Sequence, residues 1–338
     1  MNQNGRINIS KGRRLKAATI IATTLTGVSK LISSGLGQEC FSHIFIDECG
    51  QAHEPEALIP ITGIAFEGPL PTWRIPKIIL SGDPLQLGPV VTSPMASKKG
   101  LSESLLERLM KCSAYQPDPL TQIPNPSVIV KLVKNFRSHA EILHSANKLF
   151  YNDELKAMGR DDNLRIACGW DLLPNKNIPL IFHSIDGREI QGAAKSYHNN
   201  EELMVVINYL TALLGPKGLN GEPLSQADVG IISPYRNQIK QLEEATRAKG
   251  WEKLEIGSVE DFQGSEKLVI ICTTVRSSRE KGKPKLGFLQ DAKRLNVTIT
   301  RARALLILVG NADVLQSNDL WSKFITMCRH NGTFIQHP

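Results

Sequence analysis

The stretch Phe41-Ser-His-Ile-Phe-Ile-Asp-Glu-Cys-Gly-Gln51 carries two adjacent carboxylates, Asp47 and Glu48, directly after a short apolar run. Such a run is typical of a buried strand in a parallel sheet that is covered on both faces. In a doubly wound α/β sheet, ligands bind just beyond the carboxyl ends of the strands. We therefore expect Asp47 to hold Mg²⁺ through water and Glu48 to orient or deprotonate an attacking water. An Asp-Glu pair at a strand end is common by chance, so the pair alone does not decide the function.

A second predicted strand, Pro76-Lys-Ile-Ile-Leu80, ends in the turn Ser81-Gly-Asp-Pro-Leu-Gln-Leu-Gly88. The turn places Gln86 past the end of the strand, beside the first two carboxylates. A neutral amide there can hydrogen-bond a terminal phosphate oxygen or the water that attacks it. The alternative is an ordinary loop with a surface glutamine.

Four further residues with phosphate chemistry lie in two arginine-bearing segments and one glycine turn. Arg137 lies in the segment 132–139, and Arg301 lies just before the apolar run 304–309. A guanidinium beside a γ-phosphate stabilises the charge that develops during its transfer. Between these segments, Gly264 allows close backbone approach, and Glu266 is placed to bind ribose or phosphate. Most arginines are surface cations, so each segment is a weak signal when taken singly.

The order of these segments is more specific than any one of them. The chain reads IFIDECGQAHEPE, LSGDPLQLGPVV, SESLLERL, LVKNFRSHAEIL, VGIISPYRNQ, GSVEDFQGSEK and RLNVTITRARALLILVGN. This series resembles motifs II to VI of the Upf-like superfamily 1 RNA helicases over residues 18–330. The segments RSHAEIL, ISPYRNQ, TVRSS and LGFLQDAKR are most similar to the Armitage and Moloney-leukaemia-virus-ten-homologue branch.

The resemblance implies a RecA-like P-loop NTPase fold, with parallel sheets, flanking helices and ATP with Mg²⁺ bound between two domains. It implies an ATP-dependent RNA helicase or translocase whose single-stranded RNA crosses both domains, in cytoplasmic small-RNA silencing and ribonucleoprotein granules. The catalytic residues that it implies are Glu48, Gln86, Arg137 and Arg301. Its nucleotide-binding residues are Asp47, Gln86, Phe136, Arg137, Gly264, Glu266 and Arg301, with Asp47 on the metal. Family contacts to the RNA backbone fall on Thr24, Ser258 and Val259.

The phosphate-cradling loop of such ATPases, GxxxxGK[ST], has no match in the sequence. We therefore expect the chain to be the C-terminal part of a helicase core, with absent or very weak ATP hydrolysis by itself. The expected divisions are a partial first RecA-like domain over 1–112, a proline-rich linker over 113–127, and a complete second domain over 128–338.

Two alternatives to an RNA helicase remain open. The chain could be a non-catalytic RNA-binding or protein-interaction module from a truncated helicase, as the missing loop suggests. It could also belong to a DNA-directed helicase of the same superfamily, because the motifs bind ATP rather than the sugar of the nucleic acid.

Composition sets looser bounds on the function. The 338 residues carry a net charge of +7 and a pI of about 9.1, which suits a phosphate-rich partner. The six cysteines form no CxxC pair, which indicates reduced thiols in a cytosolic setting and no zinc site. No apolar run approaches the ~20 residues of a membrane span. Aromatic residues make up only 6%, so no stacking platform for single strands is indicated.

The periodicity predicts alternating strands and helices. We expect strands at 17–22, 44–46, 76–80, 128–133, 179–183, 229–233, 256–259, 268–272 and 304–309. We expect helices at 28–36, 101–111, 140–149, 201–214 and 236–249, the second of them capped by Ser102.

Overall fold

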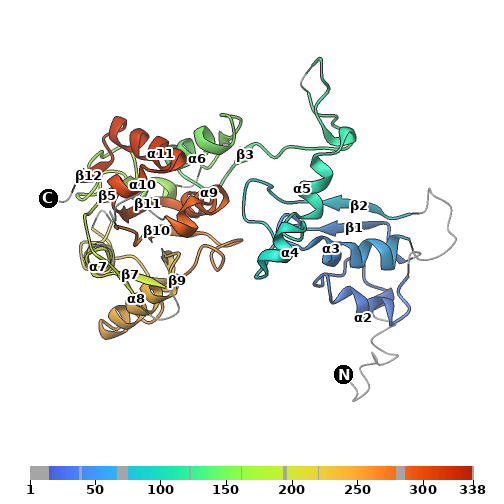
Figure 1. Cartoon of the computed structure of the whole chain (residues 1–338), viewed down its shortest axis with the longest axis horizontal. Coiled ribbons are helices and arrows are strands. Elements are labelled where there is room, and N and C mark those ends of the chain that lie inside the picture. The colour runs from blue at the N-terminus through green and yellow to red at the C-terminus, as the bar shows by residue number, and fades with distance from the viewer. Residues whose placement is uncertain are drawn as a thin grey trace. The chain divides into compact units, whose positions relative to one another are not determined.

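The computed structural model describes residues 15–37, 40–66, 75–121, 123–160, 162–192, 196–219, 221–278 and 286–336. The chain divides into two compact units, Met1–Lys131 and Leu132–Pro338 (Figure 1). We call them unit 1 and unit 2. No described helix is both long enough and apolar enough to span a bilayer.

Unit 2 is built on a six-stranded sheet with the order β12-β5-β11-β10-β8-β9, and every neighbouring pair is parallel. The strands are β5 (Leu180–Ser184), β8 (Val229–Ile232), β9 (Glu255–Gly257), β10 (Lys267–Thr273), β11 (Ala302–Gly310) and β12 (Phe334–Gln336). The all-parallel order confirms the predicted α/β sheet of RecA-like type.

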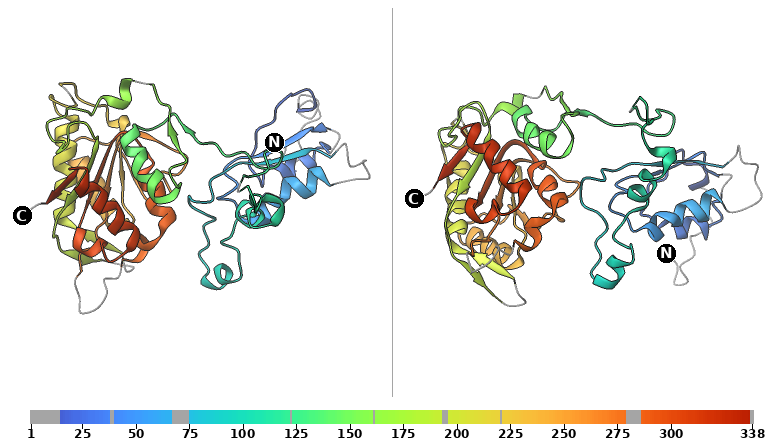
Figure 2. Two further views of the ribbon diagram at one scale, coloured as in Figure 1. Left: turned by 90° about the horizontal axis from the view of Figure 1, so that it is seen from above. Right: turned by 45° about the horizontal axis from the view of Figure 1, so that its top comes forward.

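Helices cover both faces of this sheet (Figure 2). They are α6 (Ala140–Phe150), α7 (Asn200–Leu214), α8 (Arg236–Ala248), α9 (Ala292–Ile299), α10 (Ala312–Leu315) and α11 (Asp319–His330). Leu305, Ile307 and Val309 of β11 pack in the core that includes α7 and Leu242 of α8. On the opposite face, Phe182 of β5 meets Phe324 of α11. A strand buried on both faces must be apolar at successive positions, which explains the unbroken apolar runs.

The smaller strands of unit 2 lie outside the main sheet. The parallel pair is β3 (Lys134–Asn135) with β4 (Lys156–Ala157), and the antiparallel pair is β6 (Glu189–Gln191) with β7 (Tyr197–Asn199).

Unit 1 contains a two-stranded parallel sheet of β1 (His43–Ile46) and β2 (Lys77–Leu80). Its helices are α2 (Val28–Ile32), α3 (Glu54–Pro60), which continues into the π-helical turn Ile61–Ala65, α4 (Pro94–Lys98) and α5 (Leu105–Met110). Val28, Ile44, Ile46, Ala57 and Leu105 share its core.

Several sequence predictions for unit 1 were wrong in detail. Strand β1 is not covered on both faces, because Ile44 and Ile46 are buried while Phe45 is 73% exposed. Residues 17–22, which were predicted to form a strand, have no strand conformation and pair with no described strand. Helix α5 is capped by Ser104, which accepts a hydrogen bond from the Glu107 N–H, and not by Ser102. Helix α2 ends at Ile32, before Gly35 takes a left-handed φ of +75°.

The predicted strand over 128–133 is also absent. Its alternate residues Val128, Val130 and Leu132 are exposed, and no described strand pairs with it. The first strand of unit 2 is instead the two-residue β3. The thiols of Cys49 and Cys272 are buried.

Candidate functional site

The exits of β1 and β2 are joined by hydrogen bonds. The Ser81 hydroxyl donates to Asp47 Oδ1 at 2.6 Å, and the Cys49 N–H donates to the Ser81 carbonyl at 2.8 Å. Both Asp47 and Glu48 are exposed. An exposed carboxylate that is oriented by a neutral hydroxyl suits an Mg²⁺ ion bound through water.

Glu48 has a left-handed backbone with φ of +51°, which is unusual for a residue with a side chain. Its carboxylate Oε2 accepts a hydrogen bond from Gln51 Nε2 at 2.8 Å. Backbone conformations of this kind cost about 1–3 kcal/mol and cluster at functional sites. The direction of the Glu48 side chain is therefore set both by the turn and by Gln51.

Gln86 is oriented by the aspartate of its own turn. Its Nε2 donates to Asp83 Oδ2 at 2.9 Å, while Asp83 Oδ1 accepts from the Leu85 N–H at 2.9 Å. The sequence reasoning missed Ser81 and Asp83 as supporting residues. The signals were a hydroxyl directly after the strand, and an aspartate before proline that is typical of an Asx-turn.

Gly82 lets the two exits approach each other. A Cβ at this position would lie 2.9 Å from the Gly50 nitrogen and 3.3 Å from the Cys49 nitrogen. We expect Gly82→Ala to destabilise this contact by about 1–3 kcal/mol, as overpacking does. Amide hydrogen exchange of Cys49 should then be about 5- to 150-fold faster. Gly100→Ala is the control for backbone strain alone, because Gly100 also has a positive φ, of +96°, but its added Cβ would meet nothing within 4 Å. Equal exchange rates at Cys49 in the two variants would contradict this packing role.

In unit 2, the two segments with Arg137 and Arg301 meet at the Gly264 turn. Arg137 Nε donates to Glu266 Oε2, and Arg303 lies 3.7 Å from the other oxygen of that carboxylate. Gly264 has φ of +76°, so only glycine adopts this turn without strain. Phe136, beside Arg137, is 65% exposed.

Arg301 is almost completely buried, with 2% of its surface exposed. Its guanidinium donates to the Val297 carbonyl at 3.1 Å, to Thr300 Oγ1 at 3.0 Å and to the Ser265 carbonyl at 3.4 Å. The structure thus brings Arg137, Gly264, Glu266 and Arg301 into one cluster, while Arg301 also supports the fold.

The residues predicted to contact RNA are engaged locally. Both the N–H and the hydroxyl of Ser258 donate to Asp261 Oδ2 at 2.8 Å. Val259 is 4% exposed, so its side chain belongs to the core. Thr24 Oγ1 accepts from the Gly27 N–H at 3.1 Å. In the described ranges, no three His, Cys, Asp or Glu side chains gather as a metal cluster. Asp47 is therefore the protein ligand that we expect for Mg²⁺, and water and nucleotide would supply the remaining ligands.

Family models and curated relatives match almost the whole chain. One model described as an AAA domain matches residues 101–313, and another with the same description matches residues 6–94. The chain is 42% identical to "Putative helicase MOV-10" of Gallus gallus, over 96% of this chain and 35% of that protein.

Two further relatives are "RNA helicase Mov10l1" of Homo sapiens and "Probable RNA helicase armi" of Drosophila melanogaster. The first is 39% identical over 94% of this chain and 26% of that protein. The second is 34% identical over 94% of this chain and 27% of that protein. The chain thus spans about a third or less of the relatives it matches. The matched models and relatives, together with the ordered motifs on a RecA-like sheet, show that the chain belongs to the Upf-like superfamily 1 helicases.

Proposed function

We propose that the polypeptide carrying this chain is an ATP-dependent RNA helicase that moves along single-stranded RNA. The observation that supports this most is the pair Asp47 and Glu48, exposed at the end of β1 and tied to the end of β2 through Ser81. Similarity to two proteins named RNA helicases supports RNA as the partner.

Each site residue then has a distinct role. Asp47 would hold Mg²⁺ through water, Glu48 would orient or deprotonate the attacking water, and Gln86 would hydrogen-bond that water. Arg137 and Arg301 would stabilise negative charge, and Phe136, Gly264 and Glu266 would contact the nucleoside. Bound Mg·ATP supplies the phosphate that is cleaved.

For this chain alone we expect RNA binding with little or no ATP hydrolysis, because its sequence contains no GxxxxGK[ST] cradle. The test is steady-state ATP hydrolysis with and without single-stranded RNA, beside Glu48→Gln and the exposed control Glu222→Gln. RNA-stimulated turnover lost only in Glu48→Gln would support the catalytic role and reveal a cradle of another sequence. RNA binding without turnover would support a catalytically incomplete core. The absence of both would overturn the proposal for this chain.

A binding measurement can distinguish whether the chain prefers RNA or DNA. We expect single-stranded RNA to bind more tightly than DNA of the same sequence, since the 2′-hydroxyl is what distinguishes them. Fluorescence anisotropy with the two labelled strands measures this difference. Equal affinities would favour the DNA-directed alternative.

Small-RNA silencing in cytoplasmic ribonucleoprotein granules is the setting that we propose for the whole protein. The resemblance of the segments RSHAEIL, ISPYRNQ, TVRSS and LGFLQDAKR to the Armitage branch supports it. Small RNAs and silencing factors should be recovered with the full-length protein from cell extracts. Recovery of neither would argue against this setting.

A further inference from the structure

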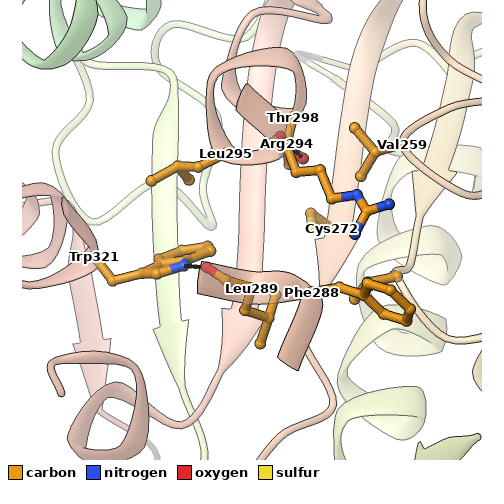
Figure 3. A pocket seen from close by; sticks show the side chains of 9 residues that line it. Val259, Cys272, Phe288, Leu289, Arg294, Leu295, Thr298 and Trp321 are labelled. Carbon is orange, nitrogen blue, oxygen red and sulfur yellow. Dashed lines mark hydrogen bonds between the residues drawn. The ribbon is translucent and has the colours of Figure 1, made fainter. Parts of the chain in front are cut away.

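Phe288 presents an exposed aromatic ring on an anchored turn. It lies in the 3₁₀ turn Gly287–Gln290 between β10 and α9, and half of its surface, 51%, is exposed. The neighbouring Leu289 carbonyl accepts a hydrogen bond from Trp321 Nε1 at 2.8 Å (Figure 3). The Leu286 carbonyl accepts from the Tyr235 hydroxyl at 3.4 Å. The backbone on both sides of Phe288 is therefore anchored.

Two side chains flank the Phe288 ring. The Arg294 guanidinium carbon lies 4.5 Å from the ring centroid, and the buried Tyr235 ring lies 6.1 Å away. Arg294 is itself fixed by Glu260, to which its Nε and Nη2 donate at 2.9 and 2.5 Å. This ion pair connects Phe288 to the turn that carries Ser258 and Val259.

The same surface contains a small cavity of about 20 Å³, large enough for a water molecule. Its lining includes Val259, Phe288, Arg294 and Trp321 (Figure 3). The cavity places the exposed ring and a guanidinium next to the turn expected to meet the RNA backbone. A planar apolar ring beside such a turn suits a nucleobase, because every base has a π-face to stack.

We propose that Phe288 stacks on one base of the single-stranded RNA bound by unit 2, with Arg294 as the residue that positions the ring. This inference rests on the proposed RNA-binding function. The low aromatic content gives no indication of a row of stacking rings, and a single ring is consistent with that content. A single stack contributes to affinity with little dependence on base sequence.

The test is binding of a labelled 12-nucleotide single-stranded RNA to Phe288→Ala, measured by fluorescence anisotropy. We expect Kd to rise roughly tenfold or more, the effect of losing one base stack. Phe288→Trp should retain wild-type affinity, whereas Phe288→Leu should behave like alanine because it keeps apolar area without a π-face. Leu172→Ala, which alters a 45% exposed leucine of the same unit, is the control and should leave Kd unchanged.

An abasic RNA of the same length separates the contribution of the bases to the affinity from the contribution of the backbone. We expect wild type and Phe288→Ala to bind it equally, since only the phosphates and sugars remain. Equal affinity of the two proteins for the base-containing RNA, or tight binding by Phe288→Leu, would overturn the stacking role while RNA binding itself stands. If wild type binds neither RNA, the proposed function fails and the stacking role fails with it.

Discussion

Raising the pH from 5 to 7.5 is expected to remove about 2–3 kcal/mol of the free energy of unfolding that Glu202 contributes. Glu202 is fully buried in α7, and burial raises the pKa of its carboxyl from 4.5 to about 7. Because the folded-state pKa is the higher one, the folded protein binds the proton more tightly. The contribution is therefore complete below about pH 4.5 and is lost as the pH rises through about 7.

Hydrogen bonds connect the buried carboxyl of Glu202 to the end of β10. Its Oε2 accepts from the Val275 N–H at 2.8 Å and from the Thr273 hydroxyl, and Asn199 lies at 3.5 Å. Val275 has φ of +71°, an outlier for a β-branched residue. Glu202 thus holds the strained turn at the end of β10.

Glu202→Gln isolates this effect, because an amide accepts hydrogen bonds but does not titrate. Urea denaturation at pH 5 and pH 7.5 should show wild type losing about 2–3 kcal/mol relative to Glu202→Gln. The quantity to compare is the difference in free energy of unfolding between the two proteins at each pH, because other groups titrate in both of them. Glu201→Gln, at an exposed position of the same helix, should follow wild type. An identical pH dependence of wild type and Glu202→Gln would refute the assignment.

Arg301→Ala is expected to destabilise unit 2 by about 3–5 kcal/mol, the loss seen when a large buried side chain leaves a cavity. The variant also removes the donors to the carbonyls of Val297 and Ser265. Arg137→Ala breaks only a partly exposed ion pair with Glu266, so it should cost about 1 kcal/mol or less.

The two arginines that resemble catalytic fingers can therefore be told apart by stability. Urea denaturation monitored by tryptophan fluorescence gives both values, because Trp321 is buried in unit 2. In the full-length protein, loss of RNA-stimulated ATP hydrolysis in Arg137→Ala with a normal unfolding curve would point to catalysis. Equal stability of the two variants would contradict the structural role of Arg301.

The parallel sheet of unit 2 was predictable because its apolar runs are unambiguous. Strands β8, β10 and β11 are buried along nearly their whole length, so their sequence has no alternation to misread. The segments 17–22 and 128–133 are equally apolar but form no strand. A strand needs a partner for its backbone groups, and apolar character alone does not provide one.

The sequence by itself determined the family, the order of the site residues and the chemistry open to each. Those properties depend on residue type and spacing, which can be read directly from the sequence. Only the tertiary structure decided that Val259 is buried, that Arg301 supports the fold, and that Phe288 is exposed beside Arg294. Burial and contact depend on which distant segments pack together, and no local pattern encodes that.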